Sequence, residues 1–153
     1  MAKGKESQTK MFEHSKAKVE LFKRYFSIYL NVIHRTPYIK KIYLYDLFAG
    51  EGKYEDGEKG SSLVAMECIK DHYYSNGQTC PNIDVWFNDF SKSQIQPDKF
   101  KIERVQEFCE KIYRPANVKV EYTKIDSSQI LSEIDVHLSK LRSDERALLF
   151  IDP

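Results

Sequence analysis

The stretch IYLYDLFAGEG, residues 42–52, decides the fold of this chain. It predicts a short apolar strand that ends at the carboxylate of Asp46 and runs into a tight turn containing Gly50 and Gly52. Glycine tolerates the positive φ angles that such turns use, and it lets the backbone approach a ligand. In an open α/β sheet, ligands bind at the carboxyl ends of the strands, where this loop would lie. The stretch therefore predicts a nucleotide-type cofactor site, although an ordinary turn gives the same local pattern.

Two common phosphate-binding motifs do not match this loop. A dinucleotide fingerprint, G-x-G-x-x-G, needs a third glycine where the chain has Glu55. A P-loop needs Lys directly after its last glycine, but Gly57 is followed by Glu58. The acids around the turn would also repel a polyphosphate. A ligand with a cationic centre, an amino group and a ribose fits better, which favours S-adenosylmethionine over another Rossmann-type nucleotide.

Composition sets limits on the class of protein. The chain has 153 residues, of which 41% are hydrophobic and 13% aromatic, enough for one compact domain. Its net charge of +1 gives no global indication of nucleic-acid binding. The first 24 residues carry seven Lys or Arg against three Glu, which leaves a nucleic-acid substrate open.

Targeting and metal-binding patterns are not found in the sequence. No apolar run approaches the roughly 20 residues of a membrane span, and the polar N-terminus lacks the apolar core of a signal peptide. Cys68, Cys80 and Cys109 are widely spaced with no C-x-x-C pair, which favours reduced structural thiols over a metal site. We therefore expect a cytoplasmic protein with no metal and no membrane association.

Apolar residues recur at two spacings along the chain. Helical spacing predicts helices at residues 13–33, at 61–75, at 98–113 with Asp98 as the cap, and from a cap at Ser127 or Ser128 onward. Short apolar runs predict strands at residues 42–47, 83–88, 118–125 and 147–151. This alternation implies parallel βαβ units. The expected fold is α/β: a Rossmann-like parallel sheet with flanking helices, an N-terminal helix, and a disordered basic tail at residues 1–12.

Each predicted strand ends at, or runs into, an aspartate: Asp46, Asp89, Asp126 and Asp152. The carboxyl ends of parallel strands lie along one edge of a sheet, so the four acids would converge on one crevice. A single aspartate at a strand end is explained by turn formation or helix capping. Four in succession, the first beside a Gly-x-Gly turn, indicate a binding site.

These motifs resemble those of class I S-adenosylmethionine-dependent methyltransferases. Residues 46–52 resemble motif I of that family, and residues 150–153 are similar to its motif IV, which faces the methyl acceptor. More narrowly, residues 18–25, 46–63 and 151–153 resemble the bacterial three-Cys-motif partner proteins. The cysteines in that name belong to a partner protein, so the resemblance also implies that this chain has a protein partner.

The resemblance implies a role for each residue of motif I. Gly50 and Gly52, with Phe48 and Ala49 beside them, would let the methionine part of the cofactor approach the backbone. Asp46 would lie near the amino group of the cofactor and offset its charge.

The adenosine part would be held by residues that follow the next two strands. Asp89 would accept hydrogen bonds from the ribose hydroxyls, and Phe90 would pack on the adenine. Asp126 would accept from the adenine amino group, with the Ser127 backbone nearby. Tyr54 would close over the site.

Motif IV supplies the predicted catalytic residues, Asp152 and Pro153. Asp152 would orient or deprotonate an acceptor nitrogen or oxygen. In enzymes that methylate amino groups of nucleic acids, an aromatic residue after this motif stacks on the flipped base, and here it would lie beyond Pro153. The acceptor therefore stays open, and so does the alternative of a catalytically inactive, methyltransferase-like assembly protein.

The resemblance also makes predictions about the sheet and the chain. Class I methyltransferases have seven strands in the order 3-2-1-4-5-7-6, and four strands are predicted here. We therefore expect the order 3-2-1-4, with residues 13–153 forming the N-terminal part of a longer methyltransferase-like domain.

Overall fold

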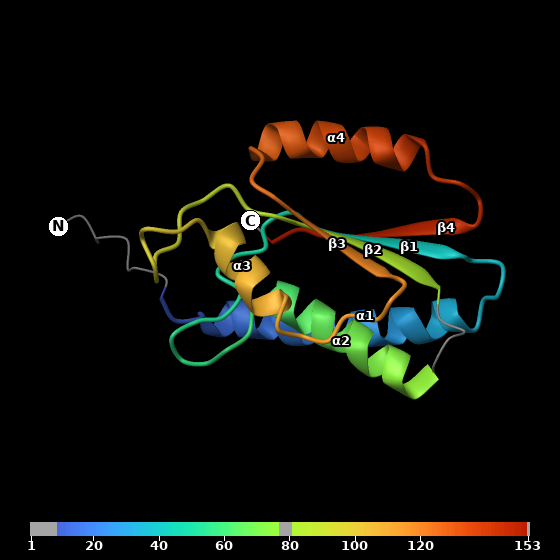
Figure 1. Cartoon of the computed structure of the whole chain (residues 1–153), viewed down its shortest axis with the longest axis horizontal. Coiled ribbons are helices and arrows are strands. Elements are labelled where there is room, and N and C mark those ends of the chain that lie inside the picture. Colours follow the sequence, from blue (N-terminus) through green and yellow to red (C-terminus); the bar gives the residue numbers. More distant parts are fainter. Residues whose placement is uncertain (1–8, 77–80, 153) are drawn as a thin grey trace.

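The computed structural model describes residues 9–76 and 81–152 (Figure 1). Its helices are α1 (Glu13–His34), α2 (Ser61–Asn76), α3 (Lys101–Cys109) and α4 (Ser127–Ser139). Its strands are β1 (Lys41–Asp46), β2 (Asn82–Asn88), β3 (Val118–Thr123) and β4 (Glu145–Phe150). Helices and strands alternate throughout, as the two spacings of apolar residues predict.

The four strands form one parallel sheet in the order β3-β2-β1-β4. β1 lies inside the sheet, where Leu44 is level with Val85 on β2 and with Leu148 on β4. The predicted α/β fold, its strand order and the N-terminal helix are therefore confirmed. The same order brings the ends of β1, β2 and β4 side by side.

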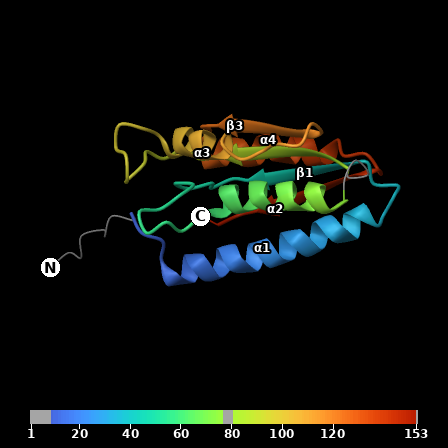
Figure 2. The same ribbon diagram turned by 60° about the horizontal axis from the view of Figure 1, so that its bottom comes forward.

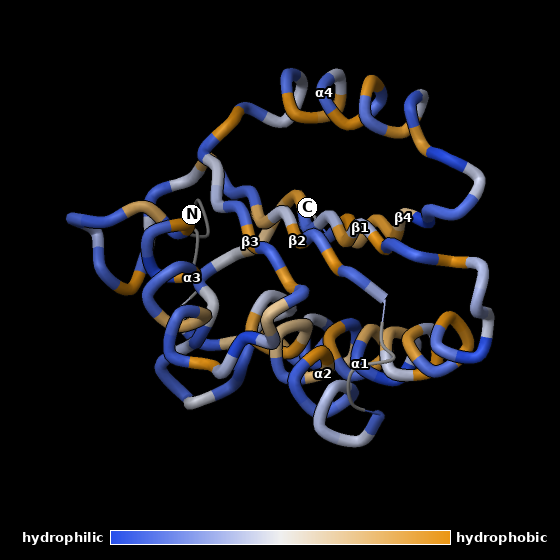
Figure 3. Tube along the Cα trace, turned by 45° about the vertical axis from the view of Figure 1, so that its right-hand side comes forward, coloured by the Kyte–Doolittle hydropathy of each residue, from blue (hydrophilic) through white to orange (hydrophobic). Residues whose placement is uncertain are grey.

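Helices cover both faces of the sheet. α1, α2 and α3 lie on one face and α4 on the other (Figure 1), and Figure 2 shows α1 and α2 side by side. The larger core lies under α1, α2 and α3, where Ile42 and Leu44 of β1 meet Phe26 of α1. Apolar residues run along the strands between the two layers of helices (Figure 3).

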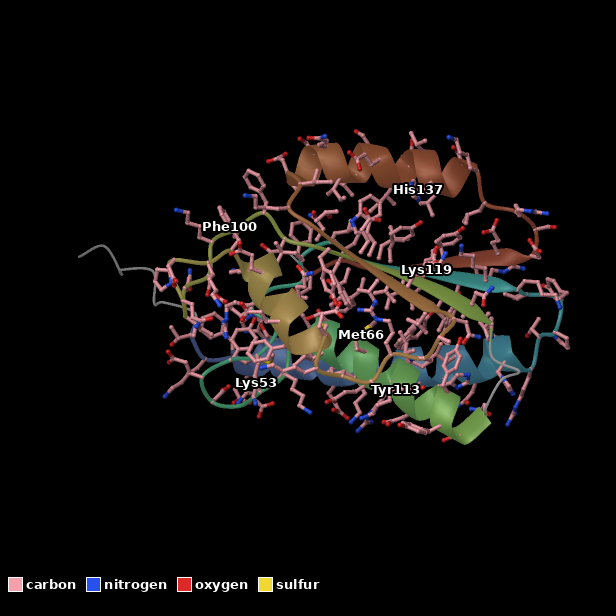
Figure 4. All side chains as sticks on the ribbon, in the orientation of Figure 1. Lys53, Met66, Phe100, Tyr113, Lys119 and His137 are labelled. Carbon is pink, nitrogen blue, oxygen red and sulfur yellow. The ribbon has the colours of Figure 1, made fainter. Side chains whose placement is uncertain are left out.

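The smaller core lies between the sheet and α4. Tyr45 and Trp86 face this side because side chains alternate along a strand, and they pack with Ile134. His137, labelled in Figure 4, belongs to the same layer, with its ring centroid 5.5 Å from that of Trp86. Among residues 9–76 and 81–152, α4 is the one helix on this face of the sheet (Figure 1).

The third helix differs from its prediction at both ends. It begins at Lys101 and not near Asp98, because the Lys99 N–H donates to the Gln96 carbonyl (2.9 Å) and closes a turn that includes Asp98. The Glu103 carboxylate accepts instead from the Phe100 N–H at the helix start (2.8 Å). The predicted cap at Asp98 is therefore wrong. The helix also ends at Cys109, which leaves the Tyr113 side chain 60% exposed.

Part of the predicted disordered tail has a defined place. Residues 1–8 lie outside the described residues, but Met11 is buried against the domain. The Glu55 N–H donates to the Thr9 carbonyl (2.9 Å), which ties the segment before α1 to the loop after β1.

Candidate functional site

A pocket of about 330 Å³ opens at the carboxyl ends of β1, β2 and β4. The loop after β1 lines it with five of its residues: Phe48, Ala49, Gly50, Tyr54 and Gly60. The other walls come from Ser61 at the start of α2, from Asp89 and Ser91 after β2, from Lys101, and from Phe150 and Asp152 at the end of β4. α1 and the segment before it add Met11, Phe12, His14, Ser15, Lys18 and Val19. Six of the predicted site residues therefore share one pocket.

Asp46, the last residue of β1, does not line the pocket but is bonded to Ser61, which does. Its side chain is buried, and its Oδ2 accepts a hydrogen bond from Ser61 Oγ (2.5 Å). Its Oδ1 has no hydrogen-bond partner within the described residues. Burial raises the pKa of Asp46 to about 7, an effect that the Ser61 hydrogen bond opposes and the charge of Asp89 reinforces. A carboxylate in this position favours a cationic or hydrogen-bond-donating neighbour.

Asp89 fixes the shape of the glycine turn. Its Oδ2 accepts the Gly50 N–H and its Oδ1 accepts the Ser91 N–H, both at 2.9 Å. Gly50 has φ +70°, in the left-handed region, and a Cβ at this position would lie 3.3 Å from the Tyr54 hydroxyl. The turn therefore depends on a glycine at its tip and on an acid from the neighbouring strand.

Gly52 performs a different task from the one predicted. It also has a positive φ (+79°), but it does not line the pocket. A Cβ at Gly52 would meet Leu63 and Phe108 at 3.3 Å and the Val105 backbone at 3.4 Å. Its missing side chain lets the loop pack on α2 and α3.

Glu51, between the two glycines, is the residue whose role the sequence did not reveal. It is 2% exposed and forms an ion pair with Arg104 of α3, with 2.8 Å between Nη1 and Oε2. It also accepts hydrogen bonds from Ser93 Oγ and from the Gln94 N–H, both at 2.7 Å. The signal that could have indicated this pair is an arginine on the apolar face of α3, next to Val105. The cluster holds the glycine turn against α3.

The residues predicted to hold the adenine do not line the pocket. Asp126 is exposed and is the N-cap of α4, where it accepts from the Ser128 N–H (3.0 Å) and from Ser128 Oγ (2.6 Å). The hydroxyl and backbone of Ser128 lower the pKa of Asp126. The predicted cap at Ser127 or Ser128 is therefore wrong, since Ser127 is the first residue of the helix. Phe90 is 56% exposed on the surface.

Asn88, at the end of β2, bridges two strand ends instead. Its side-chain amide donates to the Ile125 carbonyl (3.0 Å), and its Oδ1 accepts from Thr123 Oγ1 (2.8 Å) and from the Ile125 N–H (2.9 Å). Its own carbonyl accepts the Ala49 N–H (3.0 Å). Asn88 thus ties the end of β2 to the end of β3 and to the loop after β1, and it does not line the pocket.

Asp152, the predicted catalytic acid, lies in the pocket wall and pairs with Lys18 of α1, with 2.7 Å between Oδ1 and Nζ. Pro153 lies outside the described residues. His14, near the start of the same helix, also lines the pocket. Arg24 pairs with Glu20 on the outer surface. His34 lies at the opposite end of α1, against His72.

Metal-binding and membrane-spanning features are absent from residues 9–76 and 81–152. In these ranges, no group of three or more His, Cys, Asp or Glu side chains is arranged to hold a metal ion. No helix there is both long and apolar enough to cross a membrane. Cys68 and Cys109 are buried free thiols, and Cys80 lies outside the described residues.

Comparison with known proteins gave no family model and no curated protein that matches the chain. The pocket and the sequence motifs are therefore the grounds on which a function can be proposed.

Proposed function

We propose that this chain binds S-adenosylmethionine and is the cofactor-binding part of a methyltransferase. The observation that carries the proposal is the buried Asp46 carboxylate. Its Oδ1 has no hydrogen-bond partner within the described residues, and its Oδ2 accepts from Ser61 in the wall of the pocket that the glycine turn lines. An unpaired polar atom in such a position is costly, so it favours a ligand that supplies a proton donor or a positive charge.

The charges of the pocket support this class of ligand. Asp89 and Asp152 line the pocket, and so do Lys101 and Lys18, the latter paired with Asp152. The lining therefore has no excess of positive charge to hold a polyphosphate. An amino group and a sulfonium are both cationic and suit the same surroundings. Gly50 lines the pocket, and because it has no side chain of its own its backbone can approach a ligand there.

The motif order supports a methyltransferase in particular. The acid, the glycine turn and the acid after the second strand stand in the order of class I methyltransferases, and the aspartate after the fourth strand resembles motif IV. We also propose that the chain is related to the three-Cys-motif partner proteins, which it resembles more narrowly. We further propose that it works in the cytoplasm.

The proposal gives each residue a physical task. S-adenosylmethionine would supply a methyl group already activated on its sulfonium, so catalysis depends mainly on alignment of donor and acceptor. Asp89 holds the Gly50 backbone in place and has carboxylate lone pairs for ribose hydroxyls. Asp152 would orient or deprotonate the acceptor, and Tyr54 covers the glycine turn.

Calorimetric titration of S-adenosylmethionine into full-length protein tests the proposal. We expect saturable binding that Asp89→Ala abolishes, because the variant leaves the Gly50 N–H without its acceptor. Asp84→Ala is the matched control: it lies on the same strand but pairs with Lys41 (2.9 Å), away from the pocket. Absence of binding by folded wild-type protein would contradict the proposal.

A second candidate is a methyltransferase-like protein that acts in assembly and not in catalysis. An apolar stripe on α1 favours it: Leu21, Tyr25, Ile28 and Val32 are each more than half exposed. Two of these residues, Leu21 and Tyr25, line a groove beside β4. Full-length protein that binds the cofactor and transfers its methyl group, with transfer lost on Asp152→Asn, would exclude this candidate. A nucleic-acid acceptor would further require an affinity that falls steeply with salt.

A further inference from the structure

The pair formed by Lys18 and Asp152 joins two distant parts of the chain inside the pocket. Lys18 belongs to α1 and Asp152 follows β4, 134 positions later, and 2.7 Å separates Nζ from Oδ1. The Lys18 side chain is 53% exposed, so it does not fill a core. Exposed ion pairs contribute little to stability. A purely structural role explains the pair poorly.

The other two acids at this edge of the sheet, Asp89 in the lining and Asp46 next to it, are held in a different way. Asp89 accepts from two backbone N–H groups, and Asp46 accepts from the Ser61 hydroxyl. Within the described residues, Lys18 is the one cation that forms an ion pair with any of the three. Lys18, a residue from outside the sheet, therefore compensates the charge of Asp152 and fixes the orientation of its carboxylate.

We infer that Lys18 is a positioning residue for Asp152, and that the pair sets how strongly the pocket prefers a cationic sulfonium to a neutral thioether. The inference rests on the proposed function. S-adenosylmethionine and S-adenosylhomocysteine differ by one methyl group and one positive charge, so the ratio of their affinities reports the charge that the pocket presents. Lys18 lowers the ratio of the affinity for S-adenosylmethionine to the affinity for S-adenosylhomocysteine, because it offsets the charge of a carboxylate. Asp152 raises this ratio.

The test is calorimetry with both ligands on full-length protein. We expect Lys18→Met to raise the preference for S-adenosylmethionine about two- to fivefold, the range of an exposed ion pair. Asp152→Asn should lower it by a similar factor, and Lys18→Arg, which keeps the charge, should stay near wild type. In the Asp152→Asn background Lys18→Met should have little effect, because Lys18 has lost its anchor.

Lys16→Met is the matched control. Lys16 is on the same helix and pairs with Glu13 (3.3 Å) and Asp56 (3.8 Å), outside the pocket lining. This variant should leave the ratio unchanged. Thermal unfolding of each variant separates lost binding from lost folding.

Three results would count against the inference, and they differ from one another. An unchanged ratio in Lys18→Met, with both ligands still bound, overturns it and leaves the proposed function intact. Equal weakening of both ligands also overturns it, because Lys18 would then contact a part that the ligands share. Binding of neither ligand to wild type overturns the proposed function, and the inference with it.

Discussion

Asp46 and Asp126 follow two strands of the same sheet but lie in opposite surroundings. Asp46 is 1% exposed, with an oxygen that has no partner in the described part of the chain, whereas Asp126 is on the surface and is bonded to Ser128. The length of the connection explains the difference. α4 begins directly after Asp126, so that carboxylate becomes its N-cap, while residues 47–60 separate Asp46 from α2. A helix that begins at once makes the aspartate its cap, whereas a longer connection leaves the aspartate at the strand end to be buried.

The largest effect should come from the buried pair that anchors the β1 loop. Arg104→Met leaves the Glu51 charge buried without its cation, and we expect it to lower the free energy of unfolding by about 3–5 kcal/mol. Urea denaturation measures this. Arg114→Met, at the exposed pair with Glu110, is the control and should change stability by less than about 1 kcal/mol. Similar losses of stability in the two variants would show that the buried pair of Glu51 and Arg104 contributes no more than an exposed pair.

Gly52→Ala should have the next largest effect, about 2–3 kcal/mol. It combines the strain of a positive φ with crowding against Leu63 and Phe108. Gly57→Ala separates the two causes, because Gly57 also has a positive φ (+82°) but a Cβ there would have no neighbouring atom within 4 Å. We expect about 1 kcal/mol for this variant, from strain alone. Equal losses would show that crowding at Gly52 contributes nothing.

Asp46 should make stability depend on pH, with a sign opposite to that of an ordinary paired acid. Its pKa is raised from 3.8 to about 7 by burial, so between these values the folded state holds a proton that the unfolded state has lost. The free energy of unfolding should therefore fall as pH rises through this window, by up to about 1.4 kcal/mol per pH unit, and level off above it. Asp46→Asn should lack this slope. Urea denaturation of both proteins between pH 5 and 8 gives the difference, and parallel profiles would contradict the assignment.

Asp126→Ala should have the smallest effect. Loss of the N-cap of α4 should lower stability by about 1 kcal/mol, and Asp126→Asn should be nearly neutral because Asn also caps helices. Neither variant should change the affinity for S-adenosylmethionine, since Asp126 does not line the pocket. A tenfold weaker affinity for S-adenosylmethionine in either variant would show that Asp126 contributes to the binding site.

The sequence predicted the elements of the fold well because burial periodicity is a local property. The strand order followed from the resemblance to class I methyltransferases, and the convergence of Gly50, Asp89 and Asp152 followed from parallel topology. The pair of Glu51 and Arg104 did not, because it joins residues 53 positions apart and depends on how α3 packs on the loop. The capping role of Asp126 was one of the alternatives that local chemistry allowed, and only the position of α4 decided between them.

The pocket also connects α1 with β4, two elements that lie far apart in the sequence. α1 supplies one wall and the end of the edge strand β4 another, so local opening of either one would dismantle the pocket. A ligand that binds only the intact pocket therefore raises the free energy of both openings by the same mass-action amount. Amide hydrogen exchange in α1 and in β4 should then slow together on ligand binding, although the two segments lie at opposite ends of the described chain.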